Sequence, residues 1–285
     1  MAAYLRPTET AAALAALHHG NFTVLAGGTD YYPAHVGRPC TEDIVDITAL
    51  EALRGIRDAG DHWRIGATTT WSQIMTAPLP AWFDALKGAA GDIGGIQTQN
   101  AGTIAGNLCN ASPAADGVPA LLALDASVEL LSVSGTQTLP LGEFILGNRK
   151  TRRRPDQLLA AILVPKSSPP RAASHFMKLG SRRYLVISFV MVGASLAVDD
   201  DGRIVTARVA VGACSAVARR LPAAEAALCG ERIDAALAER LTVDHLAALA
   251  PISDVRADAQ YRRDAALTLL RRTIAELAAR LEVLQ

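Results

Sequence analysis

The sequence predicts an α+β protein of two domains. Short strand-like and helical runs follow one another through the first part of the chain, up to a strand closed by Pro165. Lys166-Ser167-Ser168-Pro169-Pro170 then has the composition of a linker. Beyond it the pattern changes to two long strands followed by helices. We therefore expect one domain over residues 1–168 and a smaller one over residues 171–285, and both lengths are ordinary for domains.

The first lobe, about residues 1–55, is expected to be a small α/β unit. Residues 8–20 are rich in alanine and leucine and predict a short helix. The apolar, β-branched run Phe22–Ala26 predicts a strand that ends at two glycines. Asp43–Ile47 alternates polar and apolar residues with period two, which predicts a second strand.

The second lobe, residues 56–168, is expected to combine short helices with an antiparallel hairpin. Helical stretches are predicted around Trp71–Met75 and over Val118–Leu124. Gly91–Asn110 is polar and interrupted by glycine, so we expect no helix there. Strands are predicted over Trp63–Gly66, over the two arms of a hairpin at Ser127–Val133 and Thr136–Leu139, and over the buried run Leu158–Val164.

The C-terminal domain is expected to be two strands followed by helices. Phe189–Val198 and Arg203–Gly212 predict strands joined by a short acidic turn. Helices are predicted over Pro222–Cys229, Asp234–Leu249 and Tyr261–Leu284. Residues at spacings of three and four form an apolar stripe along the last helix: Ala266, Leu269, Leu270, Thr273, Ile274, Leu277 and Leu281.

Composition excludes several classes of function. Half of the residues are hydrophobic and a fifth are charged, which is typical of a globular protein. The formal net charge is zero, whereas a nucleic-acid binder usually carries a basic excess. No secretory signal or membrane-length apolar run is present in the sequence, so we expect a cytoplasmic protein. The four cysteines form no close pair, so we expect no metal and reduced, mostly buried thiols.

Ala26-Gly27-Gly28-Thr29-Asp30 is the first candidate for binding chemistry. A strand delivers the chain to two glycines, where no Cβ blocks an approaching ligand. Successive N–H groups of such a turn can point at one anion. No lysine or arginine lies within the turn, so main-chain dipoles would hold the anion. Taken alone, the pattern is more often that of an ordinary turn.

Thr103-Ile104-Ala105-Gly106-Asn107 is the second candidate and again joins a hydroxyl residue to a turn of small residues. The two segments belong to different expected lobes, which suggests a clamp on a pyrophosphate. The arrangement is not the dinucleotide fingerprint G-x-G-x-x-G, and the sequence also lacks G-x-x-x-x-G-K-[ST]. Neither a Rossmann site nor a P-loop is therefore expected.

Asn110–Asp116 follows directly, and its polar residues allow two interpretations. Ser112 with Pro113 can begin a helix, and so can Asp116 as the capping residue. In the other interpretation the Asp116 carboxylate accepts hydrogen bonds from ribose hydroxyls. The residues themselves favour capping and leave the choice open.

Five segments in order resemble the FAD-binding subunits and domains of the molybdenum hydroxylase, or xanthine dehydrogenase, family. The resemblance covers nearly the whole chain. It implies a two-lobed FAD-binding domain of the vanillyl-alcohol-oxidase (PCMH) type, followed by a C-terminal domain of the CO-dehydrogenase flavoprotein type. The segments are LAGGTDYYP (25–33), QNAGTIAGNLCNASPAADGVPALLALDASVEL (99–130), GNRKT (147–151), PDQLLAAILVP (155–165) and KLGSRRYLVISFVMVGASL (178–196).

The same resemblance implies which residues contact FAD. Asp116 matches an acidic contact to the cofactor, Leu159 an apolar contact to the flavin, and Lys178 a lysine near the pyrimidine edge. A cation there would stabilise negative charge on the reduced ring. The two loops match over Val24, Leu25, Ala26, Gly27, Gly28, Thr29, Asp30 and Tyr31, and over Thr103, Ile104, Ala105, Gly106 and Asn107.

The chain departs from the family pattern at several positions. Ala105 replaces the more usual glycine of the second loop, so a left-handed backbone is not expected there. Ile93 stands where some members have an aromatic residue near the flavin, and Tyr31-Tyr32 replace an aliphatic pair. The basic run Arg149–Arg154 is either a solvated loop or a docking patch for a partner subunit or an acidic electron acceptor.

The resemblance implies that this chain is the FAD-binding electron-transfer subunit of a heteromeric oxidoreductase. A molybdopterin-binding large subunit would oxidise the substrate, and a small subunit with 2Fe-2S clusters would pass electrons to FAD, which delivers them to NAD+ or another acceptor. No residue here stands out as an acid–base or nucleophilic catalyst. The alternative is a self-contained FAD-dependent oxidoreductase, and a third class is a non-enzymatic ligand-binding module. His245, expected within a helix, offers little as a general base, which favours the relay.

Overall fold

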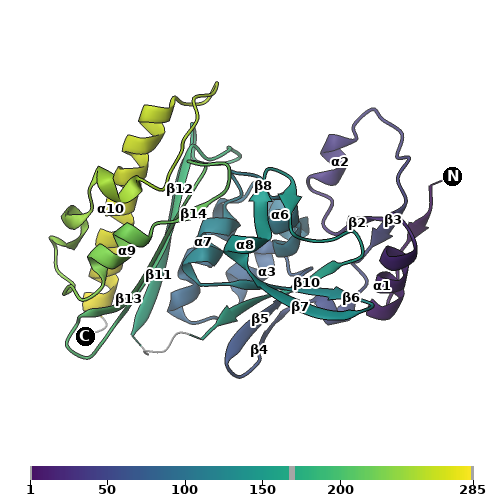
Figure 1. Ribbon diagram of the computed structural model, residues 1–285, viewed down its shortest axis with the longest axis horizontal. Coiled ribbons are helices and arrows are strands. Elements are labelled where there is room, and N and C mark those ends of the chain that lie inside the picture. Colours follow the sequence, from purple (N-terminus) through teal and green to yellow (C-terminus); the bar gives the residue numbers. More distant parts are fainter. Residues whose placement is uncertain (1, 167–170, 284–285) are drawn as a thin grey trace.

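A computed structural model describes residues 2–166 and 171–283, so most of the expected linker lies outside the described residues. The described chain forms three parts in a row (Figure 1), with the N-terminal lobe at one end and the C-terminal domain at the other. The second lobe lies between them and contacts both. Within the described ranges, no helix is long and apolar enough to cross a lipid bilayer.

The N-terminal lobe is a three-stranded sheet with one covering helix, and its first strand was not predicted. The strands lie in the order β1-β3-β2 and both pairings are parallel. The expected helix and both expected strands are present. The elements are β1 (Tyr4–Leu5), α1 (Thr10–His19), β2 (Thr23–Leu25), α2 (Tyr31–Ala34) and β3 (Ile44–Asp46), followed by the 3₁₀ turn η1 (Glu51–Leu53).

The second lobe carries a five-stranded antiparallel sheet in the order β4-β5-β10-β6-β7. The predicted hairpin forms its β6-β7 edge, and the predicted apolar strand is the central β10, which is almost wholly buried. The strands are β4 (Ile56–Asp58), β5 (His62–Gly66), β6 (Ser127–Ser132), β7 (Gly135–Pro140) and β10 (Leu158–Pro165), with a small separate hairpin of β8 (Ile145–Gly147) and β9 (Lys150–Thr151).

Helices connect these strands, and they correct one expectation. Gly91–Asn110 was expected to contain no helix, but it carries the end of α4 and two further helices. Gly94, Gly95 and Gly102 fall between helices, while Gly91 and Gly106 lie in the terminal turns of α4 and α6. Gly94 takes the left-handed conformation that separates α4 from α5. The helices of this lobe are α3 (Trp71–Thr76), α4 (Asp84–Asp92), α5 (Ile96–Ala101), α6 (Ile104–Asn110), α7 (Gly117–Ala123) and α8 (Leu141–Phe144), with η2 (Ala81–Phe83).

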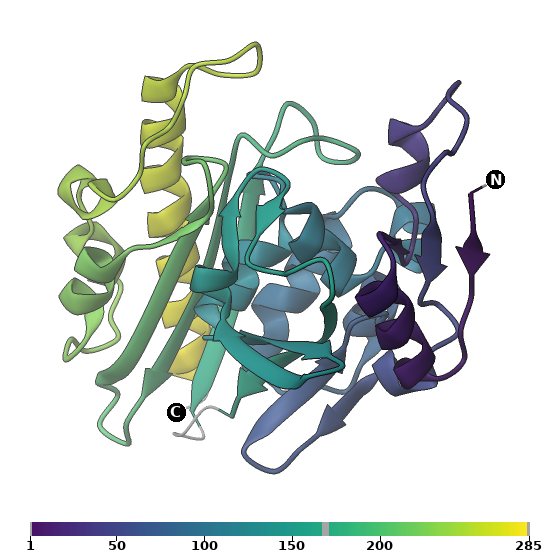
Figure 2. The ribbon, with the colours of Figure 1, turned by 45° about the vertical axis from the view of Figure 1, so that its right-hand side comes forward.

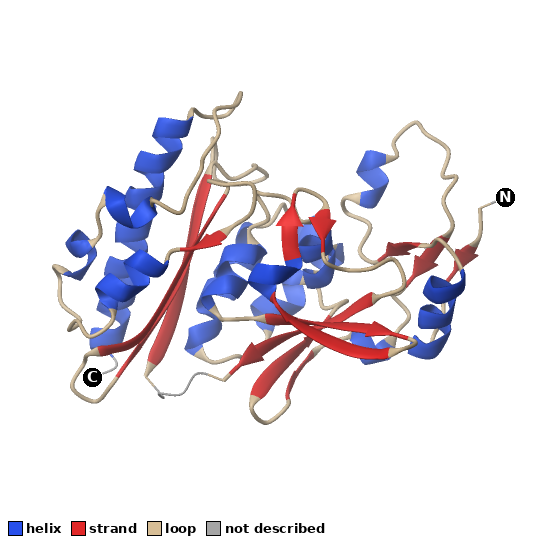
Figure 3. Ribbon diagram, in the orientation of Figure 1, coloured by secondary structure: helices blue, strands red, loops and turns tan. Residues whose placement is uncertain are grey.

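The C-terminal domain is a four-stranded antiparallel sheet in the order β11-β12-β13-β14. The strands are β11 (Ala172–Leu179), which was not predicted as a strand, and β12 (Val190–Val198), β13 (Ile204–Gly212) and β14 (Arg219–Arg220). The long helix α10 (Ala259–Val283) and α9 (Pro222–Leu228) cover one face, while α4 and α7 of the second lobe cover the other (Figure 3). Helices on both faces explain why every residue of β12 is buried.

The helical end of the chain is confirmed in part. All seven residues of the predicted stripe on α10 are buried in the C-terminal core. Asp234–Leu249, however, is not one helix but two 3₁₀ turns, η3 (Leu237–Arg240) and η4 (Val243–Leu246). The reason is Thr242, which has an extended backbone and forms a reciprocal capping box with His245, so a new turn begins there.

Close backbone approach joins the second lobe to the C-terminal sheet. A Cβ on Gly193 of β12 would lie 2.7 Å from the carbonyl of Pro119 in α7, so only glycine fits without movement. Two residues further along the strand, the Ser195 hydroxyl donates to the Ala123 carbonyl at 2.6 Å. Figure 2 shows the C-terminal sheet standing beside the helices of the second lobe. The two parts therefore pack as one body at this seam.

The four cysteine side chains are free thiols, but the expectation that most are buried is wrong. Cys40 and Cys229 are exposed, Cys109 is half-buried, and only Cys214 belongs to the core. Burial raises the pKa of the Cys214 thiol to about 11. Among the residues that the structure describes, no three His, Cys, Asp or Glu side chains gather as they would around a metal ion.

Candidate cofactor site

The first glycine loop leaves the parallel sheet of the N-terminal lobe and approaches the second lobe very closely. A Cβ on Gly27 would lie 1.9 Å from the carbonyl oxygen of Ala101, at the end of α5. Gly28 has φ of +70°, a conformation that favours glycine. Gly28 then leads into the short helix α2, and Tyr32 folds back over it. Both glycines are thus required by local geometry.

The N–H groups of this loop are available to a ligand. From Gly27 to Tyr31, the five backbone N–H groups have no hydrogen-bond acceptor among the described residues; the next one, of Tyr32, donates to the Gly28 carbonyl at 3.1 Å. Buried N–H groups normally have partners, and a turn of consecutive free donors is a typical anion-binding nest. The prediction that main-chain dipoles of this loop can hold an anion therefore has a geometric basis.

The second segment differs from the expected turn, because Thr103 caps a helix. The Thr103 hydroxyl accepts a hydrogen bond from the Gly106 N–H at 3.1 Å, and α6 begins at Ile104. The N–H groups of Ile104 and Ala105 donate to the carbonyls of Thr69 and Ala67. The first N–H groups of α6 are therefore engaged within the chain. This segment offers a ligand its side chains and close backbone, not a second nest, and Ala105 needs no left-handed conformation.

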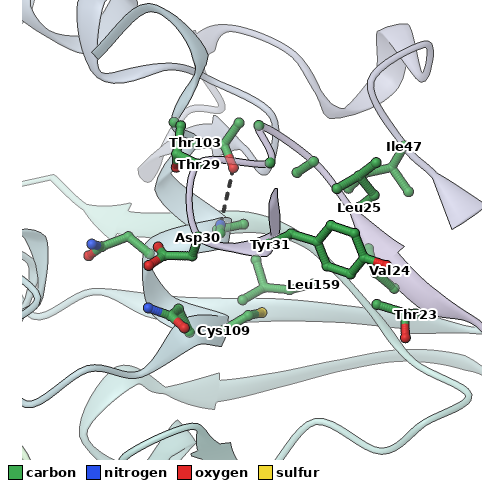
Figure 4. Close-up of a pocket in the computed structure, with 18 of the residues that line it drawn as sticks. Thr23, Val24, Leu25, Thr29, Asp30, Tyr31, Ile47, Thr103, Cys109 and Leu159 are labelled. Carbon is green, nitrogen blue, oxygen red and sulfur yellow. Dashed lines mark hydrogen bonds between the residues drawn. The ribbon is translucent and has the colours of Figure 1, made fainter. Parts of the chain in front are cut away.

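The two segments line one cavity of about 590 Å³, a size typical of small-ligand sites. In Figure 4, Thr29 and Thr103 lie on one side, Val24, Leu25 and Tyr31 on the other, and Leu159 below. Of the predicted contact residues, thirteen line the cavity: Val24, Leu25, Ala26, Gly27, Gly28, Thr29, Asp30, Tyr31, Thr103, Ala105, Gly106, Asn107 and Leu159. Ile104, Asp116 and Lys178 are not among its lining residues.

A buried polar atom at this cavity is available to form a hydrogen bond with a ligand. The Asn107 side-chain oxygen is buried and has no hydrogen-bond partner among the described residues. Such an atom costs free energy unless a ligand or water satisfies the group. Ile93 also lines the cavity, at the position where relatives were expected to have an aromatic residue. The free N–H groups and two hydroxyl side chains can donate to a phosphate, and the Asn107 oxygen can accept from a ligand hydroxyl, so the site fits a phosphate-bearing group with hydroxyls.

Asp116 and Lys178 are brought together by the fold although 61 residues separate them. The Lys178 ammonium donates to the Asp116 carboxylate at 2.6 Å and to the Asp92 carbonyl at 3.0 Å. The Ser188 hydroxyl donates to the other carboxylate oxygen at 2.5 Å. Both charged side chains are less than a tenth exposed. Burial raises the pKa of the Asp116 carboxyl, and Lys178 and Ser188 oppose that rise.

This arrangement decides the helix-capping question. Asp116 precedes α7, but its side chain makes no capping hydrogen bond. The carboxylate instead faces the C-terminal domain, which supplies both of its donors from β11 and from the segment before β12. The pair is linked to the cavity wall through Asp92, whose carbonyl accepts from Lys178 and which precedes the wall residue Ile93 in the chain.

Sequence reasoning missed the charged residues of the cavity wall. Arg149 and Arg153, from the basic run after β8, line the cavity together with Pro155. The signal was present as a run of basic residues, but its periodicity does not reveal which side chains face a ligand. Trp71 also lines the cavity and packs in the core beneath it.

Tyr31 lies in a small polar cluster at one edge of the cavity. Its hydroxyl is 3.1 Å from the Cys40 sulfur, and its ring lies against the ring of His35, which also lines the cavity. The hydrogen bond with Cys40 and burial raise the pKa of Tyr31 to about 12. Tyr31 is therefore neutral at physiological pH. Tyr32 is largely exposed and does not line the cavity.

Fold and site together define a two-domain protein with a cavity of about 590 Å³ between the two lobes of its first domain, lined by a glycine loop with free N–H groups. Two family models match the chain: the FAD binding domain in molybdopterin dehydrogenase over residues 1–167, and the CO dehydrogenase flavoprotein C-terminal domain over residues 174–277. The chain belongs to the family of FAD-binding medium subunits of the molybdenum hydroxylases. Xanthine dehydrogenase is one of these hydroxylases.

Individual relatives agree with this assignment. The putative xanthine dehydrogenase FAD-binding subunit of Escherichia coli K12 is 31% identical over 90% of this chain and 88% of its own length. The nicotinate dehydrogenase FAD-subunit of Eubacterium barkeri is 38% identical over 63% of this chain and 62% of that subunit. Among solved structures, CO dehydrogenase from Oligotropha carboxidovorans superposes with a TM-score of 0.89, 27% identity and 98% coverage of both chains.

Proposed function

We propose that the cavity between the lobes holds FAD and that the chain relays electrons between a partner subunit and a final acceptor. The observation that carries the proposal is the first loop, which lines a cavity shared with a different lobe and has five N–H groups without an acceptor among the described residues. A pyrophosphate needs hydrogen-bond donors that no side chain blocks. Gly27 and Gly28 provide main-chain N–H groups and have no side chain. The family assignment identifies the dinucleotide as FAD.

The chain's own residues would bind and orient the cofactor. We assign the pyrophosphate to the N–H groups from Gly27 to Tyr31, with the hydroxyls of Thr29 and Thr103 and the Asn107 amide beside them. Apolar residues of the wall, such as Leu159, would exclude water from the bound rings. When bound, FAD supplies reversible uptake and release of electrons.

Asp116 and Lys178 remain proposed cofactor contacts, now as a pair. The ammonium of Lys178 donates to the carbonyl of Asp92, the residue before Ile93 of the cavity wall. A buried cation at this place favours negative charge on a bound ring, because charges interact more strongly where water is excluded. Asp116 holds that ammonium in position and partly compensates its charge.

The partner chains and the acceptor are also proposed from the relatives. Two of them are described as medium chains or subunits, of carbon monoxide dehydrogenase and of nicotine 6-hydroxylase. We propose a molybdopterin-binding large subunit and a small subunit with 2Fe-2S clusters as electron donors, and NAD+ as acceptor, in the cytoplasm. This favours the relay over a self-contained oxidoreductase.

Flavin content tests the cofactor proposal. The full chain, purified after expression with riboflavin, should retain about one FAD per chain, identified by chromatography after denaturation. Gly27→Ala should lose at least tenfold in FAD affinity, because its Cβ would meet the Ala101 carbonyl. Gly147→Ala is the matched control, since a Cβ there meets nothing within 4 Å. A wild-type chain without flavin, or a Gly27→Ala chain with normal flavin, would overturn the proposal.

Co-purification from the native source tests the relay. Two further chains should accompany this one, and metal analysis should find molybdenum and iron in the complex. Anaerobic addition of NAD+ to the substrate-reduced complex should restore the oxidised flavin spectrum. Isolation of the chain alone with full substrate turnover would defeat the subunit assignment in favour of a self-contained enzyme.

A further inference from the structure

We propose that Arg149 and Arg153 bind the two phosphates of the dinucleotide and supply the positive charge that the glycine loop lacks. The inference rests on the proposed FAD site and deepens it. It concerns two members of a basic run whose other members face elsewhere. The loop that follows β8 thereby becomes part of the cofactor site instead of a docking patch.

The position of the two arginines is the first observation. Both line the same cavity as the first glycine loop. Arg149 lies in the turn between β8 and β9 with φ of +55°, a conformation that is uncommon for a residue other than glycine. Such backbone geometry is often found where the chain must aim a side chain at a ligand. Arg149 is thus placed at the cavity at a local conformational cost.

Arg153 is held in place by the main chain. Its Nη1 donates to the Gln157 carbonyl at 2.7 Å and to the Arg154 carbonyl at 3.2 Å. Neutral carbonyls orient the guanidinium without cancelling its charge. The remaining nitrogens can donate to a ligand, because a guanidinium carries five N–H groups in a planar fork. A fixed fork of this kind matches the oxygens of a phosphate.

The neighbouring cations of the run are used differently. Arg152 lies 3.9 Å from the Glu143 carboxylate, and Arg154 pairs with Asp156 at 3.0 Å. Neither lines the cavity. Within the described chain, Arg149 and Arg153 have no carboxylate within 4 Å. The two arginines without an acidic partner are therefore the two that face the cavity.

Charge balance gives the second reason. A pyrophosphate diester carries one negative charge on each phosphate, and Asp30 adds a carboxylate to the same cavity wall. The first N–H groups of α6 are already engaged, so this helix provides no further donors. The nest of the first loop contributes dipoles but no net charge. Two guanidinium groups match the two phosphates, as electrostatic complementarity in a partly enclosed site requires.

Matched substitutions within the run test the proposal. Arg149→Gln and Arg153→Gln in the full chain should each raise the Kd of FAD about tenfold, the effect of one charge-assisted hydrogen bond. The Kd of riboflavin, which has no phosphate, should stay unchanged in both variants. Arg152→Gln and Arg154→Gln, made in the same loop, should leave both constants near the wild-type values. Titration of each deflavinated chain with FAD or riboflavin, followed by flavin fluorescence, measures these dissociation constants.

Ionic strength and a conservative change give a second readout. Rising salt should weaken FAD binding to the wild-type chain more steeply than to Arg149→Gln or Arg153→Gln, since charge pairs are screened. Arg153→Lys should recover part of the lost affinity. The proposal would be overturned if Arg149→Gln and Arg153→Gln bound FAD as tightly as Arg152→Gln does. It would also be overturned if the two variants lost as much affinity for riboflavin as for FAD. A wild-type chain that binds neither flavin would instead defeat the FAD site itself.

Discussion

Replacing Lys178 by methionine tests the buried ion pair between the second lobe and the C-terminal sheet. Lys178→Met keeps an apolar side chain of similar length but removes both the charge beside Asp116 and the donor to the Asp92 carbonyl. The Asp116 carboxylate would then keep only Ser188 as a donor, in a site where it is 7% exposed. A buried carboxylate without its cation takes up a proton instead of remaining charged.

This proton uptake sets the magnitude and the pH dependence. In the unfolded chain the carboxyl of Asp116 titrates near its ordinary value of about 3.9. A raised folded-state pKa means that the folded variant holds a proton which the unfolded chain releases, so its stability falls as pH rises above about 4. The loss grows by about 1.4 kcal/mol per pH unit, to a ceiling of about 4 kcal/mol at pH 7. The lost hydrogen bond to Asp92 adds about 1 kcal/mol at every pH.

Urea unfolding of the full chain between pH 5 and pH 8, followed by circular dichroism and tryptophan fluorescence, measures these terms. Asp116→Asn combined with Lys178→Met is the control, because it has no titrating group at the site. The single variant should be less stable than the double variant at pH 7, and this difference should shrink toward pH 5. A difference that stays constant over this range would refute the reasoning.

Two further predictions concern packing and thiol chemistry. Gly193→Ala should lower the free energy of unfolding by about 1–3 kcal/mol, because the added Cβ meets the backbone of α7; an unchanged urea midpoint would contradict this close approach. Ellman's reagent should modify the exposed Cys40 and Cys229 rapidly and Cys214 only after denaturation, because burial raises the pKa of Cys214 to about 11. Rapid reaction of Cys214 in the folded chain would show that its core opens readily.

Elements with a strong periodic pattern were predicted correctly. The apolar run at β10 and the stripe on α10 are buried as expected, because each pattern reports one face that must leave water. The failures lie where local pattern is weak. Gly91–Asn110 forms helices because its glycines sit at their ends and Thr103 supplies a cap, whereas composition alone suggested a loop. The 234–249 segment breaks because Thr242 starts a new turn.

For the site, the sequence by itself located the first glycine loop at the end of a strand, because only glycine leaves the backbone open to a close approach there. The close approach to Ala101 and the free N–H groups were decided by the tertiary structure. Only the tertiary structure decided that the second segment is a capped helix start with its N–H groups engaged. It also decided that Asp116 pairs with Lys178, and that Arg149 and Arg153 face the cavity. These are contacts between residues distant in sequence, and their geometry depends on how the two lobes and the C-terminal sheet pack together.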